Sequence, residues 1–173
     1  MKFNPFLFMK VCLYLIVIFL PLINGFVIGN KVCNVGESSG EAVKFRPPAS
    51  AFGIAWAILY LCIGLSWFFA IYLPNDIKIN KKLYSILIVS FFYILLNIVL
   101  SLWIVFYSCY KDKINSIFIL IGSIVASLFC YTVGNTTSRM FITPLIGWLL
   151  LATLLNVDEV NQMKNQDVDE QTK

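Results

Sequence analysis

The sequence predicts an all-α, polytopic membrane protein built as a bundle of five transmembrane helices. Hydrophobic residues make up 60% of the 173 residues and charged residues 13%, against about 45–50% and about 25% in soluble domains. The charges are clustered, and roughly 20 consecutive apolar residues suffice to cross the hydrocarbon core of a bilayer. Five stretches have the required length and apolar character: residues 11–28, 49–73, 83–107, 114–133 and 140–157. We therefore expect a multi-pass integral protein that has the lipid bilayer as a partner.

The first apolar stretch, residues 11–28, has two interpretations. Its basic leader, apolar run and small residue at Gly25 also fit a signal peptide that is cleaved. Apolar character resumes directly after Gly25, so the segment is long enough to span a membrane, and we favour a retained helix. The connection Gly29–Arg46 that follows is either a flexible linker or a lid over a cavity. From its residues alone we favour the linker.

The second stretch begins after a double proline, Pro47-Pro48, which suits the first turn of a helix because no hydrogen bond is lost there. Aromatic and small residues then recur in steps of four and three, which places them on one side of a helix. These residues are Phe52, Trp56, Tyr60, Gly64 and Trp67. We expect this stripe to face other helices or a ligand rather than lipid.

Two further helices carry similar stripes. Asn97 lies near the middle of the third stretch, where an amide is costly in lipid and must face the bundle interior. From chemistry alone, a hydrogen bond to a neighbouring helix is favoured over a ligand contact for this residue. The fifth stretch carries four residues in steps of four: Pro144, Trp148, Ala152 and Asn156. If the three stripes converge, they enclose a cavity with aromatic walls and a few polar groups, as small-molecule sites have.

The fourth stretch predicts helix packing. Gly122, Ala126 and Cys130 recur every four residues, and small residues at this interval allow two helices to approach closely. We expect this face to pack within the bundle or against a second copy of the chain. The tail 158–173 is rich in charged and amide side chains, a composition typical of disorder.

Charge and residue usage exclude several classes of function. The net charge of +4 comes from Lys and Arg spread over all loops, without the basic run that nucleic-acid binding requires, so no nucleic-acid partner is expected. The chain has no histidine and its five cysteines lack metal-site spacing, so no metal site is expected. Cys33 and Cys109 fall on one side of the membrane, but nothing in their spacing supports a disulfide, and we expect free thiols.

The sequence does not predict an orientation in the membrane. With five spans, Lys and Arg divide almost equally between the two sides, and the positive-inside rule requires an excess on one side. Five spans do place the two termini on opposite sides.

The helix motifs resemble those of one membrane-protein family, the translocator proteins, also called peripheral benzodiazepine receptors or tryptophan-rich sensory proteins. The second-helix signature is matched by Pro47-Pro48, Phe52, Gly53, Trp56, Leu59-Tyr60, Gly64 and Trp67. The fifth-helix signature is matched by Pro144, Trp148, Ala152 and Leu155-Asn156, and the third-helix pair by Leu96-Asn97. The resemblance runs from about Phe45 to Asn156.

The resemblance implies a receptor- or transporter-like protein with a pocket inside the bundle, often a homodimer, whose first loop closes the pocket. Family members bind porphyrins, sterols and synthetic ligands, so a tetrapyrrole is expected here as a ligand and not as a cofactor. The implied pocket residues are Phe52, Trp56, Asn97, Trp148, Ala152 and Leu155. The implied structural residues are Pro47, Pro48, Tyr60, Gly64, Pro144 and Asn156. The membrane implied is the mitochondrial outer or another intracellular membrane, or a bacterial cell envelope.

Several positions depart from the family pattern. The tryptophan usual three residues after the third-helix asparagine is Leu100 here, and the nearest tryptophan is Trp103. Val157 and Asn161 stand where the sterol-recognition pattern needs a tyrosine and a basic residue, so cholesterol binding does not carry over.

Two alternative functions follow from the same resemblance. A porphyrin-degrading membrane enzyme is one, although the spans offer neither histidine nor an acid–base pair. A membrane scaffold with a degenerate pocket is the other, and it is suggested by Leu100.

Overall fold

The computed structural model describes residues 5–33, 47–72 and 79–171. These residues form five long helices: α1 (Pro5–Phe26), α2 (Ala49–Ile71), α3 (Ile79–Ile104), α4 (Lys113–Val133) and α5 (Thr136–Gln171). Two π-helical turns, η1 (Val27–Val32) and η3 (Val105–Cys109), continue α1 and α3. All five helices are long and apolar enough to cross a membrane, which confirms the predicted all-α, five-helix membrane fold.

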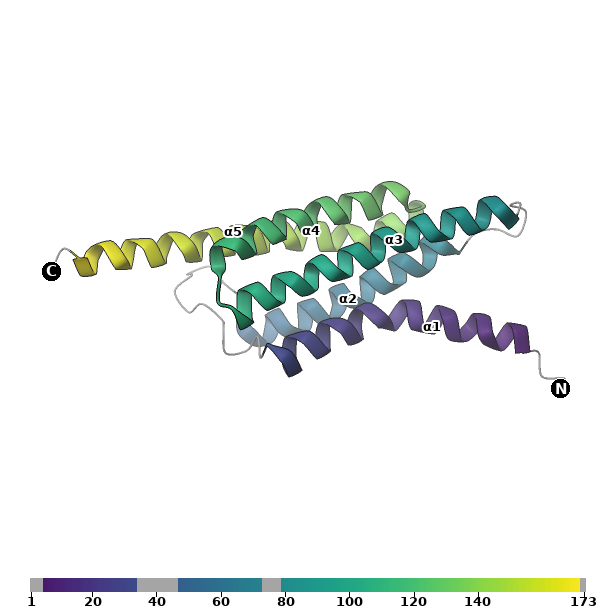
Figure 1. Ribbon diagram of the computed structural model, residues 1–173, viewed down its shortest axis with the longest axis horizontal. Helices are drawn as coiled ribbons and strands as arrows, with labels where there is room; N and C mark the ends of the chain where they lie inside the picture. The colour runs from purple at the N-terminus through teal and green to yellow at the C-terminus, as the bar shows by residue number, and fades with distance from the viewer. Residues whose placement is uncertain (1–4, 34–46, 73–78, 172–173) are drawn as a thin grey trace.

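The helices form one bundle in which sequence neighbours are not always spatial neighbours (Figure 1). α1 packs along α2, α2 packs against α5, α5 against α4, and α4 against α3. At one end of the bundle η1 and η3 end while α2 and α4 begin, and α5 projects beyond that end. We call this the cavity end, for the cavity described below. At the opposite end α1 and α3 begin, and α4 turns into α5.

The start of α2 follows the double proline, as its sequence predicts. The helix begins at Ala49, and the amide of Phe52 donates to the carbonyl of Pro48 at 3.1 Å. Gly64 has a steric role farther along α2, because a Cβ there would collide with the backbone carbonyl of Ile18 in α1. A glycine at this point therefore allows the two helix backbones to approach closely.

A buried hydroxyl cluster joins α2, α3 and α5 at the end opposite the cavity. Ser66 Oγ lies 2.6 Å from Tyr93 Oη and donates to the carbonyl of Ser138 at 2.8 Å. Ser138 Oγ lies 2.9 Å from Tyr93 Oη, which closes the triangle of hydroxyl groups. All three side chains are buried, so every hydroxyl is hydrogen-bonded where water does not compete.

The small-residue face of α4 packs inside the bundle. Ala126 and Cys130 are buried together with the α4 serines Ser116, Ser123 and Ser127. Gly122 lies at the edge of this face, since a Cβ there would only contact Val99, at 3.7 Å. Of the two interpretations of this face, the structure shows packing against neighbouring helices of the same chain.

The tail differs from the disorder expected for 158–173. α5 continues as a helix to Gln171, and Glu159 is buried at 6% exposure. Gln162 Nε2 donates to Asp158 Oδ2 at 2.8 Å, one helical turn away. The prediction of disorder rested on the number of charged residues in the tail. The helix is stabilised because one of those residues, Glu159, has partners elsewhere in the bundle.

Pro144 lies on the exposed surface of α5, although its spacing predicted an interior position with Trp148, Ala152 and Asn156. Four-residue steps drift by about 40° each around a helix of 3.6 residues per turn. Over the three steps from Asn156 back to Pro144 the drift is about 120°, enough to move the stripe from the interior to the surface.

A disulfide joins Cys33 to Cys109, which are 76 residues apart in the sequence, so the expectation of free thiols at these positions was wrong. Cys33 caps η1 and Cys109 ends η3, and both turns reach the cavity end of the bundle. Spacing along the chain carries no signal for a bond between two helices that meet only in the fold. Residues 34–46 of the proposed linker or lid lie outside the described residues.

A candidate ligand cavity at one end of the bundle

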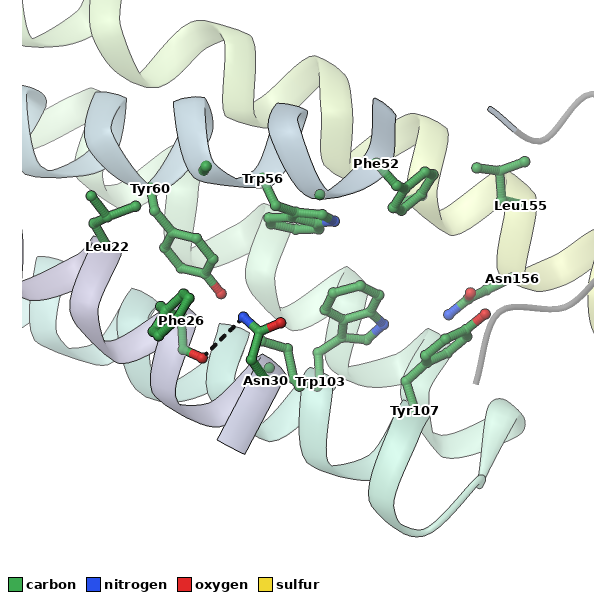
Figure 2. A pocket seen from close by; sticks show the side chains of 16 residues that line it. Leu22, Phe26, Asn30, Phe52, Trp56, Tyr60, Trp103, Tyr107, Leu155 and Asn156 are labelled. Carbon is green, nitrogen blue, oxygen red and sulfur yellow. Dashed lines mark hydrogen bonds between the residues drawn. The ribbon is translucent and has the colours of Figure 1, made fainter. Parts of the chain in front are cut away.

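A cavity of about 310 Å³ lies at the cavity end, enclosed by α1 with η1, α2, α3 with η3, and α5 (Figure 2). Four separate segments of the chain therefore contribute its walls. Its lining residues are Leu22, Gly25, Phe26, Gly29, Asn30, Phe52, Gly53, Trp56, Ala57, Tyr60, Trp103, Ile104, Tyr107, Ala152, Leu155 and Asn156.

The wall of the cavity is dominated by aromatic rings arranged around Trp56. Trp103 of α3 stacks on Trp56 with ring centroids 5.1 Å apart and an interplanar angle of 29°. Tyr60 lies one helical turn further along α2, with its ring centroid 5.7 Å from that of Trp56. The two indoles are too close for a third ring to pass between them. They therefore form one continuous aromatic surface beside the cavity.

The space for this wall depends on a glycine in α1. Gly25 faces Tyr60, and a Cβ at this position would collide with the tyrosine ring. The ring of Tyr60 therefore lies directly against α1 at Gly25, and its hydroxyl points toward the side chain of Asn30 (Figure 2).

Two hydrogen-bond donors in this wall have no partner among the described residues. The Tyr60 hydroxyl and the Trp103 Nε1–H are both buried, and neither makes a hydrogen bond there. Buried polar groups are normally paired, and an unpaired one costs about 1–3 kcal/mol. A ligand that carries acceptor oxygens or nitrogens would satisfy both donors.

The rest of the polar lining is already engaged within the protein. Asn30 Nδ2 donates to the carbonyl of Phe26 at 3.2 Å, and Asn156 Nδ2 donates to Ser116 Oγ at 3.1 Å. These two amides lie on opposite walls, in η1 and α5, and their side chains are fixed by those bonds.

An ion pair closes the cavity end behind Tyr107. The Tyr107 hydroxyl donates to Glu159 Oε2 at 2.8 Å, and Lys113 Nζ lies 3.4 Å from Glu159 Oε1. The same ammonium lies 3.3 Å above the centre of the Tyr107 ring, a cation–π contact. This cluster joins η3, α4 and α5. It is also the tertiary anchor that extends α5 beyond the predicted span.

Within the residues that the structure describes, no three His, Cys, Asp or Glu side chains lie together as a metal site would need. The arrangement is suited to stacking and hydrogen bonding.

The model of the TspO/MBR family matches residues 11–160. The chain belongs to this family. The match includes α1 and α4, which carry none of the motifs on which the resemblance rested, and it confirms the resemblance and the multi-pass membrane location. A comparison with curated proteins gave no significant match.

Four of the six predicted pocket residues of this TspO/MBR protein lie on the cavity wall: Phe52, Trp56, Ala152 and Leu155. Trp148 lies behind the wall, with its ring centroid 5.1 Å from that of Phe52 and 6.3 Å from that of Trp56. It supports the aromatic surface without lining the cavity. Ligand contacts for these residues stay a prediction.

Asn97 does not reach the cavity. Its Nδ2 donates to the carbonyl of Tyr93 at 2.8 Å, and the residue lines a separate cleft between α1 and α3. In that cleft Asn24 Nδ2 donates to Ser101 Oγ at 2.7 Å. This bond lies within α3 and does not link Asn97 to a neighbouring helix, and Asn97 Oδ1 has no partner among the described residues. The pocket role that the family motif implies for Asn97 stays a prediction.

Sequence reasoning missed the cavity residues of α1, η1 and η3, and it did not assign Trp103 to the pocket. Trp103 follows Leu100 by three residues, which places the two on neighbouring faces of α3, about 60° apart. Leu100 is buried, and the indole one turn further on supplies the aromatic ring. The residues of α1 carry no aromatic or polar stripe that marks them.

Proposed function

We propose that this TspO/MBR protein binds a flat hydrophobic small molecule, a porphyrin or another tetrapyrrole, as a receptor or carrier. The observation that carries the proposal is the stacked pair Trp56–Trp103, which forms one wall of a cavity of about 310 Å³. This volume lies at the lower end of the range of about 300–1,000 Å³ found for ligand pockets. A small cavity with a planar wall favours a thin, plate-like molecule over a bulky one.

The polar groups of the cavity narrow the class of ligand further. The Tyr60 hydroxyl and Trp103 Nε1–H are donors without a partner among the described residues, so the complementary ligand carries acceptors such as carbonyl, carboxylate or ring nitrogen atoms. A pure hydrocarbon would leave both donors unpaired at a cost of about 1–3 kcal/mol each. An aromatic ring system with acceptor atoms would stack on the indole surface and accept hydrogen bonds from both donors.

Ala152 provides a direct test, because this small residue is buried on the α5 wall of the cavity. Leucine at this position would add bulk to the α5 wall and reduce the space in the cavity. The matched control is Ala51→Leu, the same substitution at an exposed position of α2 away from the cavity. Both variants lie in apolar helices, and only Ala152→Leu changes the cavity.

The assay is a titration of the detergent-purified protein with protoporphyrin IX, followed by tryptophan fluorescence. Three of the four tryptophans, Trp56, Trp103 and Trp148, line the cavity or pack directly behind its wall, so a bound porphyrin quenches most of the emission. We expect saturable quenching in the wild-type protein and in Ala51→Leu, and a weaker or absent saturable phase in Ala152→Leu. Quenching that never saturates, or that is equal in all three proteins, would contradict the proposal.

A further inference from the structure

The α1 wall of the cavity depends on few connections to the rest of the cavity end. α1 packs along α2 and touches α3 much less. Its last turns and η1 nevertheless form one side of the cavity, from Leu22 to Asn30. Toward α3 this segment is held by the hydrogen bond from Asn24 Nδ2 to Ser101 Oγ and, beyond Asn30, by the Cys33–Cys109 disulfide.

The disulfide joins two neighbouring walls of the cavity close to their lining residues. Cys33 follows the cavity residue Asn30 by three positions, and Cys109 follows the cavity residue Tyr107 by two. Both cysteines end π-helical turns, η1 and η3. The covalent bond therefore fixes the separation between the α1 wall and the α3 wall where the two helices finish.

The other cysteines show that this pairing is specific to the cavity end. Cys12, Cys62 and Cys130 are free thiols and lie within the helical spans. Disulfides persist in oxidising compartments and are rare where glutathione and thioredoxin keep thiols reduced. The disulfide at the cavity end therefore indicates that this end faces an oxidising compartment.

We propose that the Cys33–Cys109 disulfide is a redox latch on the cavity and that the cavity end of the bundle faces an oxidising compartment. With five spans, the chain then ends on the side of that compartment and begins on the opposite side of the membrane. Lys and Arg are almost equally divided between the two sides, so they do not predict an orientation. The disulfide distinguishes the two sides of the membrane because it lies at one end of the bundle.

The redox step is an ordinary thiol–disulfide exchange. Closing the latch removes two electrons and two protons from the thiols of Cys33 and Cys109, and a disulfide donor such as glutathione disulfide accepts them and becomes two thiols. A dithiol reductant reverses the step. With the latch open, the α1 wall keeps its packing on α2, the Asn24–Ser101 hydrogen bond and a small contact with α3, so we expect the wall to open more often.

The test uses the purified full-length protein with and without a phosphine reductant, followed by hydrogen–deuterium exchange of peptides covering the end of α1 and η1. We expect reduction to increase exchange in these peptides. Cys33→Ser should match the reduced wild-type protein and not respond to reductant. Cys12→Ser, which alters a free thiol of the same helix, should behave as the wild type does. Equal exchange with and without reductant would overturn the latch.

Ligand release gives a second readout, which rests on the proposed function. Opening the latch should speed the dissociation of protoporphyrin IX and raise its Kd by about fivefold or more, the lower end of the usual range for coupling between two sites. If protoporphyrin IX binds neither form but exchange responds to reduction, the proposed function fails and the latch stands. If protoporphyrin IX binds both forms equally and exchange does not respond, the latch fails and the proposed function stands.

The orientation has its own test. A glycosylation tag is appended to one terminus at a time, and each protein is translated into sealed microsomes, whose lumen is oxidising. We expect the tag after Lys173 to be glycosylated and the tag before Met1 to remain unmodified. The reverse pattern, or alkylation of both Cys33 and Cys109 in protein that was thiol-trapped inside cells, would overturn the orientation.

Discussion

Trp103→Leu tests whether the indole pair is a binding surface or only packing. Trp103 is 5% exposed and stacks on Trp56 at 5.1 Å, and leucine keeps the position apolar while it removes the ring and its N–H. An aromatic contact contributes about 0.5–1.5 kcal/mol beyond the area that it buries. Since 1.4 kcal/mol corresponds to a tenfold change in affinity, losing one such contact with a ligand raises the Kd about 2- to 12-fold.

Trp67→Leu is the matched control for this prediction. Trp67 is 4% exposed and stacks on Tyr93 with centroids 5.8 Å apart and an interplanar angle of 5°, but it does not line the cavity. Both substitutions remove a buried, stacked indole, so both should lower stability, by less than the approximately 3–5 kcal/mol of a truncation to alanine. Only Trp103→Leu should lower affinity.

Affinity in this pair of variants is measured by equilibrium dialysis of protoporphyrin IX, because each variant lacks one of the fluorescent tryptophans. Thermal unfolding followed by circular dichroism reports the stability of both. The reasoning is refuted if Trp103→Leu binds the porphyrin as tightly as the wild type, or if Trp67→Leu loses as much affinity.

Three further predictions concern the bundle. Gly64→Ala should lower the melting temperature, because its Cβ would collide with the α1 backbone, whereas Gly147→Ala, where a Cβ meets nothing within 4 Å, should leave it unchanged; thermal unfolding checks both. Glu159→Gln breaks the buried ion pair with Lys113 and should lower stability by about 3–5 kcal/mol. Proteolysis of the end of α5 should become faster. An unchanged cleavage rate would contradict the role of Glu159 in anchoring α5. Hydrogen bonds from the backbone and side chain of Asn115 lower the pKa of Asp112. The Asp112 carboxylate therefore stabilises α4 at a pH above its ordinary pKa, and this stabilisation is lost as the pH falls through the lowered pKa. The melting temperature of Asp112→Asn should therefore change less than that of the wild type between neutral and strongly acidic pH.

Periodicity predicted those parts of the site that lie on one long helix. Phe52, Trp56 and Tyr60 share a face because a step of four residues is only slightly more than one helical turn, and all three line the cavity. The same reasoning failed at Pro144, because the drift of such a stripe accumulates with length. Periodicity also does not say which helices become neighbours, so the contribution of α1 to the cavity was not predictable from its uniformly apolar sequence.

The charged tail was interpreted from its composition and the cysteines from their spacing in the sequence. Contacts between distant residues in the fold decided both features differently. Glu159 looked like one of several solvated charges in a tail, yet Tyr107 and Lys113 hold it in a buried site. Cys33 and Cys109 showed no motif, because the spacing of a pair in sequence carries no information about two turns that meet only in the folded bundle. Both errors lie at the cavity end, where four segments converge.

The two ends of the bundle differ in how they satisfy their buried polar groups, and this difference locates the site independently of any motif. At one end the hydroxyls of Ser66, Tyr93 and Ser138 satisfy one another, which leaves no polar group for a ligand. At the other end the donors of Tyr60 and Trp103 find no partner among the described residues. Pairing is complete in that hydroxyl cluster, whereas the two donors beside the cavity keep unsatisfied hydrogen-bonding capacity. That capacity, next to an aromatic wall, is where an acceptor-bearing flat ligand would gain most from binding.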